Sequence, residues 1–209
     1  MGKSSVTRQR ILTRGLALMS QVGLAGITIG VLAEQSGMSK SGLFAHFRSK
    51  DDVQIGLLDF MAEFSQEHVV RPALHEPEGL PRLRVLIRNW FGWTRRAGLP
   101  GGCPVAAGLF EYDDVDGPVR DKILVMENEW RGLLADLTRM CVERRHFQSD
   151  LDVDQFVWEL CGIYLSHHAG HRFLRSADAD RRAELAIDAL IGRSELRARR
   201  RASSSPRPR

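Results

Sequence analysis

Hydrophobic residues recur every three or four positions along most of this chain, which is the spacing of an α-helix with one buried face. In residues 7–22 the apolar positions form one stripe that ends before Gly23: Ile11, Leu12, Leu16, Met19 and Val22. Further helices are predicted over residues 49–70, 82–97, 119–147, 153–174 and 178–191. No segment alternates polar and apolar residues as a strand would, so the pattern predicts an all-α fold.

Residues 28–50, TIGVLAEQSGMSKSGLFAHFRSK, combine two helix caps and a turn in a short span. Thr28 can cap a first helix, and Gly37 supplies the residue type that ends a helix in a left-handed conformation. Ser39 can then cap a second helix over residues 40–47. Caps and a turn at this spacing predict a helix-turn-helix, although any short helical hairpin can share part of the pattern.

The second helix of this segment would present two different faces. Leu43 and Phe47 are apolar and would hold it against the first helix. Its other side carries small, polar and basic residues, namely Lys40, Ser41, Gly42, Ala45 and His46. Such a face can approach a groove of double-stranded DNA closely and meet base edges and phosphates.

Charge is distributed unevenly along the sequence. Residues 1–50 contain seven Lys and Arg but one acid, whereas residues 51–196 contain 17 bases and 25 acids. A solvated charged face would not explain why acids avoid the first fifty residues, and a basic segment on an acidic body is typical of a polyanion-binding module. Residues 197–209 add six Arg and no acid, and their low complexity predicts a disordered tail with non-specific attraction to DNA.

The three cysteines, Cys103, Cys141 and Cys161, are far apart in sequence, so they predict neither a disulfide framework nor a zinc site. No apolar run approaches the ~20 residues of a membrane span, and the N-terminus lacks the apolar stretch of a signal peptide. We therefore expect a soluble protein of the reducing cytoplasm, with no cofactor and no membrane partner.

The segment 28–50 resembles the DNA-binding motif of the TetR family of bacterial transcriptional regulators. The matching features are the capping Thr, then Ala-Glu-x-x-Gly, then His-Phe near the end of the second helix, then Ser-Lys. The resemblance implies a three-helix DNA-binding head at residues 1–50, a helical ligand-binding and dimerisation domain at 51–193, and a basic tail at 194–209. It also implies a homodimeric repressor that a small molecule releases from a palindromic DNA operator.

The resemblance implies roles for single residues as well. The residues that would face DNA are Thr28, Ser39, Lys40, Ser41, Gly42, Phe44, Ala45, His46 and Lys50. Among them, His46 and Lys50 would contact phosphates, and Ala45 would face the groove near a thymine methyl group. Phe44 stands where the family usually has Tyr, so the hydroxyl that commonly meets a phosphate is absent.

Bulky apolar side chains gather on the predicted middle helices. Most often such a set is only core, but in the resembled family these helices surround a pocket. The residues predicted to line it are Trp90, Trp93, Cys103, Phe110, Met126 and Trp130. Few unpaired charges accompany them, so the ligand would be small and largely apolar or aromatic. Cys103 also offers an alternative, because a thiol at a helix start can sense oxidants or electrophiles, unless it is simply a small buried residue.

Small residues at every fourth position mark the helix predicted over 153–174. They are Gly162, Ser166 and Gly170, and with Ile187 and Leu190 of the final helix they predict a homodimer interface. Packing within one subunit is the alternative. The dimer is favoured because two recognition helices one DNA turn apart require two-fold symmetry.

Other classes of function have weaker support. His167, His168 and His171 suggest a metal, but no acid or cysteine in the same turn completes a site, so no metal is predicted. A cysteine-dependent enzyme built on Cys103 and a histidine lacks recognisable catalytic context, so no catalytic residue is predicted. A DNA-packaging protein using only the basic tail would bind without sequence preference.

Overall fold

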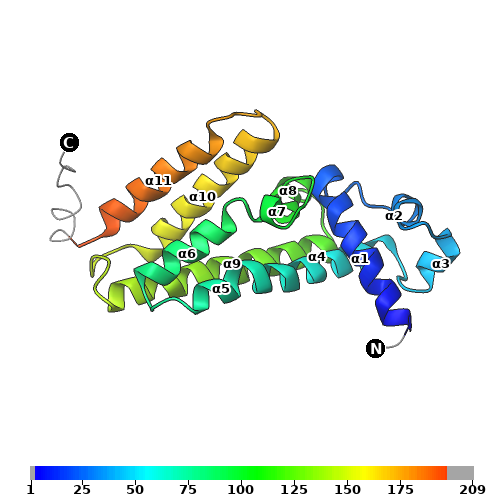
Figure 1. The fold of residues 1–209 in the computed structure, drawn as a ribbon, viewed down its shortest axis with the longest axis horizontal. Helices are drawn as coiled ribbons and strands as arrows, with labels where there is room; N and C mark the ends of the chain where they lie inside the picture. The colour runs from blue at the N-terminus through cyan, green and yellow to red at the C-terminus, as the bar shows by residue number, and fades with distance from the viewer. Residues whose placement is uncertain (1–2, 197–209) are drawn as a thin grey trace. The chain divides into compact units, whose positions relative to one another are not determined.

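The computed structural model describes residues 3–196, and all of its regular elements are helical (Figure 1). They are α1 Lys3–Val22, α2 Ile29–Ser36, α3 Lys40–Phe44, α4 Lys50–Ser65, the π-helix η1 Gln66–Val70, α5 Arg71–Leu74, α6 Leu80–Trp90, α7 Trp93–Arg96, α8 Pro104–Glu111, α9 Pro118–Glu143, α10 Val153–Arg172 and α11 Ala179–Ser194. In this part of the chain the β-type pairing is limited to an isolated bridge between Phe147 and Glu195. The all-α prediction is therefore confirmed.

The chain divides into two compact units that are not continuous in sequence. One unit contains the residues up to His68 together with Gly92–Asn128, and the other contains Val69–Phe91 together with the residues from Glu129 onward. The chain thus passes between the units three times: within η1, between α6 and α7, and within α9. The boundaries of a head at 1–50 and a body at 51–193 remain a prediction, and residues 197–209 of the tail lie outside the described residues.

The core of the first unit is built on one side of α1. Ile11, Leu12, Leu16 and Met19 of the predicted stripe are buried, whereas Val22 at its end is exposed. These side chains belong to a core that also includes the buried leucines of α2, α3 and α4: Leu32, Leu43, Leu57 and Leu58. Burial of apolar surface on this scale is what fixes the short helices α2 and α3 in place, because such helices are marginal on their own.

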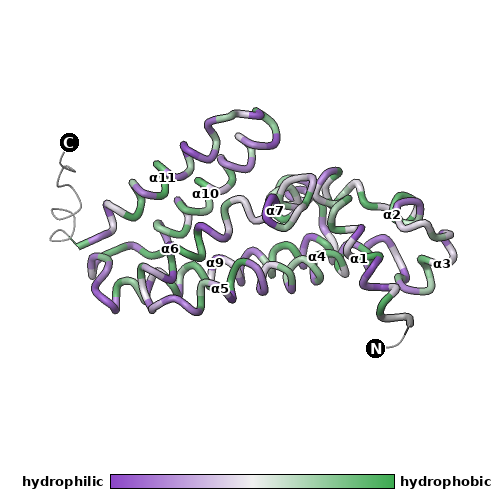
Figure 2. The backbone as a smooth tube through the Cα atoms, in the orientation of Figure 1, coloured by the Kyte–Doolittle hydropathy of each residue, from purple (hydrophilic) through white to green (hydrophobic). Residues whose placement is uncertain are grey.

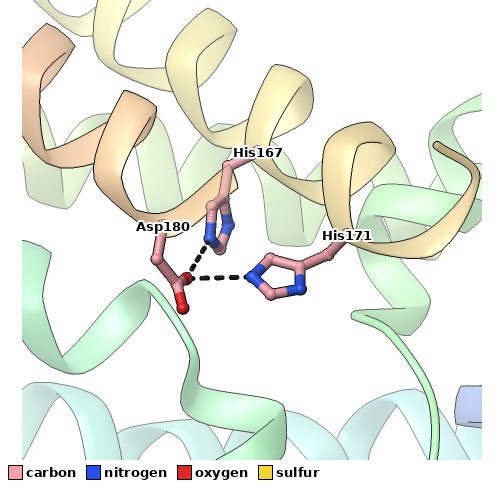
Figure 3. A group of neighbouring side chains, drawn as sticks. All are labelled: His167, His171 and Asp180. Atoms are coloured by element: carbon pink, nitrogen blue, oxygen red, sulfur yellow. Dashed lines mark hydrogen bonds and ion pairs between the residues drawn. The ribbon is translucent and has the colours of Figure 1, made fainter. Parts of the chain in front are cut away.

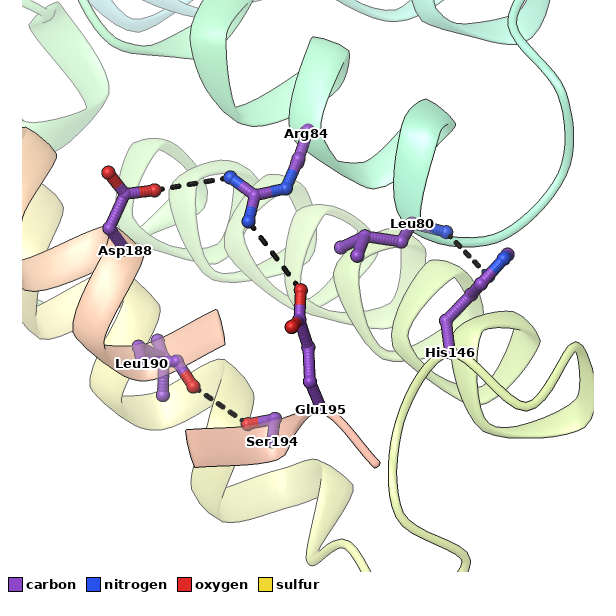
Figure 4. Close-up of polar contacts among 7 residues, drawn as sticks. All are labelled: Leu80, Arg84, His146, Asp188, Leu190, Ser194 and Glu195. Carbon is purple, nitrogen blue, oxygen red and sulfur yellow. Dashed lines mark hydrogen bonds and ion pairs between the residues drawn. The ribbon is translucent and has the colours of Figure 1, made fainter. Parts of the chain in front are cut away.

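In the second unit α10 and α11 lie side by side as a helical hairpin (Figure 1). Both carry hydrophobic and hydrophilic residues in turn, as helices with one buried side do (Figure 2). Arg84 of α6 forms ion pairs with the end of this hairpin: its guanidinium lies 3.1 Å from Asp188 and 3.7 Å from Glu195 (Figure 4). The end of α9 is joined to α6 as well, since His146 Nδ1 accepts a 3.0 Å hydrogen bond from the Leu80 N–H (Figure 4).

The single helix predicted over 49–70 is wrong, because the segment is divided and helical structure continues past Pro72. Helix α4 ends at Ser65, the π-helix η1 follows, and α5 begins at Arg71 with the proline in its first turn. A proline has no N–H to donate to the preceding turn, but a first turn needs no such donor, so the residue is tolerated there. Because the π-helix ends at Val70, Pro72 lies in the first turn of α5 and not inside a longer helix.

The helix predicted over 82–97 is interrupted. Phe91 ends α6 in an extended conformation, and Gly92 follows in the left-handed region with φ 76° before α7 begins at Trp93. Glycine adopts this conformation at no steric cost, so the chain can turn here although the hydrophobic spacing continues through the break. Helices α9, α10 and α11 lie close to where the sequence predicts helices.

Candidate functional site

Helices α2 and α3 form the predicted helix-turn-helix, with a cap at each expected position. Thr28 Oγ1 accepts a 3.2 Å hydrogen bond from the Val31 N–H at the start of α2. Gly37 ends α2 in the left-handed conformation, with φ 64° and ψ 33°. Ser39 Oγ accepts a 3.1 Å hydrogen bond from the Gly42 N–H at the start of α3. Each cap satisfies a backbone donor that the helix itself leaves unpaired.

Helix α3 is shorter than the predicted 40–47. It ends at Phe44, and the next residues form a tighter turn in which the His46 N–H bonds the Leu43 carbonyl at 2.9 Å. Phe47 lies beyond this turn and is buried, so the chain bends back toward the core instead of extending the helix. The recognition segment therefore consists of a five-residue helix and a turn.

The predicted DNA-facing residues lie mainly at the surface of this unit. Those that are exposed are Thr28, Ser39, Lys40, Ser41, Phe44, Ala45 and Lys50, whereas Gly42 and His46 are half-buried. Phe44 leaves 53% of its surface exposed, which is unusual for an aromatic residue next to buried Leu43. The hydroxyls of Ser39 and Ser41 lie 3.0 Å apart, so one can donate to the other while either faces a partner.

Lys40 lies over the first turn of α2. A Cβ atom at Gly30 would lie 3.4 Å from Lys40 Cε and 3.8 Å from its Nζ, so the lysine side chain runs within van der Waals distance of this turn. Neither α2 nor α3 has an acid in its first turn. A helix N-terminus carries partial positive charge, and a nearby lysine adds to it, so this surface has positive potential that these first turns do not neutralise.

Other basic residues of the head have contacts within it. Lys50 Nζ donates to the Ala25 carbonyl at 3.3 Å, and Arg14 donates to the Gln35 carbonyl near the end of α2 at 3.2 Å. The guanidinium of Arg8 lies 5.0 Å from the centre of the Phe47 ring. Arg8 and Arg14 thus stabilise the head, and Lys50 would have to exchange its carbonyl partner to contact a phosphate.

The loop between α1 and α2 is held by side chains from the end of α8, and sequence reasoning missed this contact. Glu111 Oε2 accepts hydrogen bonds from the N–H groups of Leu24 at 2.8 Å and Ala25 at 2.9 Å. Buried Gln54 donates to the Leu24 carbonyl at 2.6 Å and to the Tyr112 hydroxyl at 2.9 Å. Burial raises the pKa of Tyr112 above its ordinary value, so the hydroxyl keeps its proton in this network.

The glycines before α8 make a second contact with α1. The Gly101 N–H donates to Ser20 Oγ at 3.0 Å, and the Gly102 N–H donates to the Ser20 carbonyl at 2.9 Å. A Cβ atom at Gly101 would lie 1.7 Å from that carbonyl oxygen, so only glycine fits this approach. The sequence shows two glycines here, but nothing local indicates that they meet α1.

The predicted ligand-lining residues fall into both units. In the second unit, the Trp90 and Trp130 rings lie 5.0 Å apart, and Trp90 also stacks on Tyr164 at 4.1 Å with an interplanar angle of 16°. Phe91 packs edge-on against the same tyrosine at 5.3 Å. Tyr164 and Phe91 thus belong to an aromatic cluster that sequence reasoning did not assemble, although both are aromatic residues on predicted helices.

One polar atom in this cluster has no partner. Trp130 Nε1 is inaccessible to solvent and makes no hydrogen bond. A buried donor without a partner costs stability unless a bound group satisfies it. The other predicted lining residues belong to the first unit, where Trp93 and Cys103 are buried, Met126 is half-buried and Phe110 leaves 65% of its surface exposed. Their role in ligand binding stays a prediction.

The residues predicted for a dimer interface differ in how far they are exposed to solvent. Gly162 and Ser166 of α10 are exposed, and nothing lies within 4 Å of a Cβ at Gly162. A Cβ at Gly170 would lie 3.2 Å from Ala179 Cβ, so this glycine lets α11 approach α10 within one chain. Leu190 is buried within the chain and Ile187 is half-buried. Gly170 and Leu190 thus pack within one subunit, which is the alternative to a dimer interface.

The histidines near the end of α10 have a carboxylate partner on the next helix. His167 Nε2 and His171 Nε2 lie 2.8 Å and 2.9 Å from one oxygen of Asp180 (Figure 3). His168 does not share this partner, and burial lowers its pKa, with Arg172 and the two neighbouring histidines adding to the effect. The sequence offers no acid in the same turn, and Asp180 meets the histidines because α11 packs along α10.

Two protein-family descriptions match the chain. "Bacterial regulatory proteins, tetR family" matches residues 11–54, which include α2 and α3. "Tetracyclin repressor-like, C-terminal domain" matches residues 79–187, which is about half of the chain. Among curated proteins, the nucleoid occlusion factor SlmA of Aliivibrio fischeri is 34% identical over 164 residues, covering 76% of this chain and 79% of that protein.

Solved structures share the fold. A TetR transcriptional regulator from Chloroflexus aurantiacus superposes with a TM-score of 0.79 at 24% identity, covering 91% of this chain and 95% of that one. AibR, solved in complex with isovaleryl coenzyme A and operator DNA, has a TM-score of 0.68 at 18% identity, covering 90% and 98%. These relatives and structures give no support to a function based on the thiol of Cys103. Together with the helix-turn-helix, the two family matches establish that this chain belongs to the TetR family of bacterial transcriptional regulators.

Proposed function

We propose that this regulator binds a palindromic operator as a homodimer and releases it when a small, largely apolar molecule binds in the helical body. The observation that carries the DNA half is the positive surface formed by Lys40 and the N-terminus of α2. Phosphate oxygens would neutralise that potential, as anions do at other helix N-termini.

Base recognition would rest on the short α3 and its turn. Lys40 and Ser41 begin this helix and are exposed, so their side chains can reach base edges. Ala45 and Phe44 are exposed and apolar, and each can pack against a thymine methyl group or a sugar. Because α3 has only five residues, few side chains can read bases, and each should matter more.

The test separates base readout from phosphate contact. We expect Lys40→Ala to weaken operator binding by ~1–3 kcal/mol and to relax sequence preference if Lys40 reads a guanine. Lys50→Ala should weaken all sequences alike and reduce the dependence of log K on log salt by roughly one. Arg139→Ala is a matched control, since this exposed arginine lies on α9 and pairs with Asp136.

An unchanged affinity and specificity in Lys40→Ala, measured by fluorescence anisotropy on operator and scrambled DNA, would contradict the proposed recognition segment. Loss of binding in Arg139→Ala would show that net charge rather than the helix-turn-helix controls affinity.

The proposed dimer uses the exposed side of α10 and α11. This side carries small or apolar exposed residues on both helices, namely Trp158, Gly162, Ser166, Ala169, Leu185 and Ala189. Large apolar side chains as exposed as Trp158 and Leu185 are typical of a protein interface. Two such helices from each protomer would form a four-helix interface with two-fold symmetry.

Gly162→Leu tests this interface without disturbing the single chain. The site is open in the chain itself, so leucine should be accommodated there and should clash only with a partner helix. Sedimentation should show monomer, and operator binding should fall. A variant that stays fully dimeric would contradict this surface, whereas an unfolded variant, recognised by circular dichroism, would contradict the open environment of Gly162.

The proposed ligand site includes the aromatic cluster of Trp90, Trp130 and Tyr164. The unpaired Nε1 of Trp130 would donate to an acceptor on the ligand, and the surrounding rings would bury its apolar part. The neighbour AibR, bound to isovaleryl coenzyme A and operator DNA, supports acyl thioesters as a first ligand class to screen. Such a ligand would join an apolar chain to a carbonyl oxygen.

Binding should quench tryptophan fluorescence and release operator DNA, and operator should weaken ligand binding by the same factor. Trp130→Phe removes the N–H but keeps an aromatic ring, so it should lower ligand affinity while leaving DNA binding intact. If this variant responds to ligand as the parent does, the pocket lies elsewhere.

A second candidate function follows from the relatives named nucleoid occlusion factor SlmA, one of them 34% identical. A factor that acts at the nucleoid, as that name says, would bind chromosomal DNA. Deleting the gene distinguishes the two: changed transcription of nearby genes supports the ligand-responsive regulator, and misplaced division over the nucleoid supports the second candidate.

A further inference from the structure

The hairpin formed by α10 and α11 brings three potential metal ligands together. His167 and His171 lie one turn apart on α10, a spacing that puts both imidazoles on one face of the helix. Asp180 in the first turn of α11 faces them, and Figure 3 shows both rings directed at the same carboxylate oxygen. We propose that His167, His171 and Asp180 form a binding site for a divalent transition-metal ion, with Zn²⁺ preferred.

The spacing of the three groups suits a metal. Their ligand atoms all lie within 4.8 Å of one another, and Asp180 Oδ1 lies 2.8 Å and 2.9 Å from the two Nε2 atoms. Ligands about 2.0–2.1 Å from a tetrahedral Zn²⁺ are separated by about 3.3 Å. The two distances from the carboxylate oxygen to the imidazole nitrogens therefore have to lengthen by less than 1 Å for an ion to replace the two hydrogen bonds, and the two nitrogens, which lie within 4.8 Å of each other, have to reach a similar separation.

The site is partly organised before any ion binds. The side chain of His167 is only 8% exposed, and its ring packs between Phe91 at 5.2 Å and His171 at 4.7 Å. Such packing limits the rotation of the imidazole, which reduces the entropy lost when it coordinates. His171 and Asp180 are 38% and 47% exposed, so an ion can reach the site from solvent and retain a water molecule as a fourth ligand.

The ligand types determine the class of ion. Imidazole nitrogen suits Zn²⁺, Ni²⁺, Cu²⁺ and Fe²⁺, whereas Ca²⁺ and Mg²⁺ prefer sets of oxygen atoms. Two imidazoles, one carboxylate and an open position match zinc sites that use three protein ligands. Coordination requires a lone pair on each Nε2, so the ring proton must lie on Nδ1 in the bound state.

An ion at this position would join the end of α10 to the start of α11 across the loop of residues 173–178. It would stabilise the hairpin that also carries the proposed dimer surface, because a ligand that binds only the folded state raises the apparent stability. The site thus gives the protein a means to respond to metal beside the aromatic cluster, whose Phe91 packs against His167.

The experiment uses the full-length chain, freed of any tag and treated with a chelator. Isothermal titration calorimetry with Zn²⁺ should show one ion bound per chain. His171→Ala and Asp180→Asn should each reduce the affinity at least tenfold, as even the loss of supporting groups can do at metal sites. Both replaced residues are partly exposed, so the variants should fold, and circular dichroism checks this. His75→Ala is the matched control, because it removes an exposed histidine outside the cluster.

Substitution with Co²⁺ gives an independent readout, since nitrogen and oxygen ligands in tetrahedral geometry produce visible absorption bands that should vanish in both site variants. A rise in melting temperature with Zn²⁺ that the variants lack would also support the proposal. Absence of saturable binding, equal binding in the site variants and the parent, or equal binding of Mg²⁺ would overturn it.

Discussion

Gly101 offers a sharp test of how the loop before α8 is attached to α1. In Gly101→Ala the new Cβ would lie 1.7 Å from the Ser20 carbonyl oxygen and 2.1 Å from its carbon, far inside any real contact. Both atoms belong to the backbone, so rotation of a side chain cannot relieve the clash. The loop must move away, and the hydrogen bonds from Gly101 and Gly102 to Ser20 must break.

The expected loss of stability has two parts. Two hydrogen bonds contribute about 0.5–1.5 kcal/mol each, and forcing extra atoms into a packed site costs about 1–3 kcal/mol more. The sum is roughly 2–6 kcal/mol, and for a chain of this size each kcal/mol lowers the melting temperature by about 2–4 °C. We therefore expect a fall of about 4–24 °C.

The assay is thermal unfolding by far-ultraviolet circular dichroism, at one fixed protein concentration because a dimer's apparent stability depends on it. The matched control is Gly132→Ala on α9, where nothing lies within 4 Å of the added methyl group. Alanine should stabilise that helix by roughly 0.5–1 kcal/mol. If Gly101→Ala melts at the parent temperature, the close approach of the loop to α1 is not present in solution.

Three other predictions are tested by alkylation, by the pH dependence of stability and by urea unfolding. Burial raises the pKa of Cys141 to about 12, so iodoacetamide at pH 8 should leave this thiol unmodified until urea unfolds the chain; rapid native alkylation would contradict its burial. The pKa of His168 is lowered from 6.5 in the folded chain, so the unfolded state takes up a proton at a higher pH than the folded state, and the free energy of unfolding falls as the pH drops below about 6.5. His168→Gln should show a smaller fall in stability over this range, and a pH profile identical to the parent's would refute this. Glu111→Ala removes the acceptor for the Leu24 and Ala25 N–H groups and should cost roughly 1–3 kcal/mol in urea unfolding, whereas an unchanged midpoint would show that water replaces the carboxylate.

Local features of the fold could be predicted from sequence because their causes are local. Thr28 and Ser39 each cap a helix at the predicted position, since a hydroxyl three residues before a free N–H is enough to define a cap. Gly37 ends α2 as expected, because few other residues adopt a positive φ. The buried stripe of α1 follows directly from its hydrophobic spacing.

Features that depend on contacts distant in sequence could not be predicted. α3 ends at Phe44 in a turn where the His46 N–H bonds the Leu43 carbonyl, and the sequence does not show this end because Leu43 and Phe47 keep a helical spacing. Glu111 and Gln54 meet the loop at Leu24 across 87 and 30 residues, a pairing that no motif indicates. Asp180 completes the histidine pair only because α10 and α11 fold into a hairpin.

The chain passes between its two units three times, and this affects how chimeric regulators could be built. Grafting only residues 1–68 onto another family member's body would transplant Gln54 without Tyr112, and the loop at Leu24 without Glu111. The recipient would have to supply an acid, a hydroxyl and a glycine at the positions of Glu111, Tyr112 and Gly101. Compatibility between the DNA specificity of one parent and the ligand response of another is therefore decided by three residues outside the DNA-binding motif, and a donor segment that includes 92–128 would carry all three.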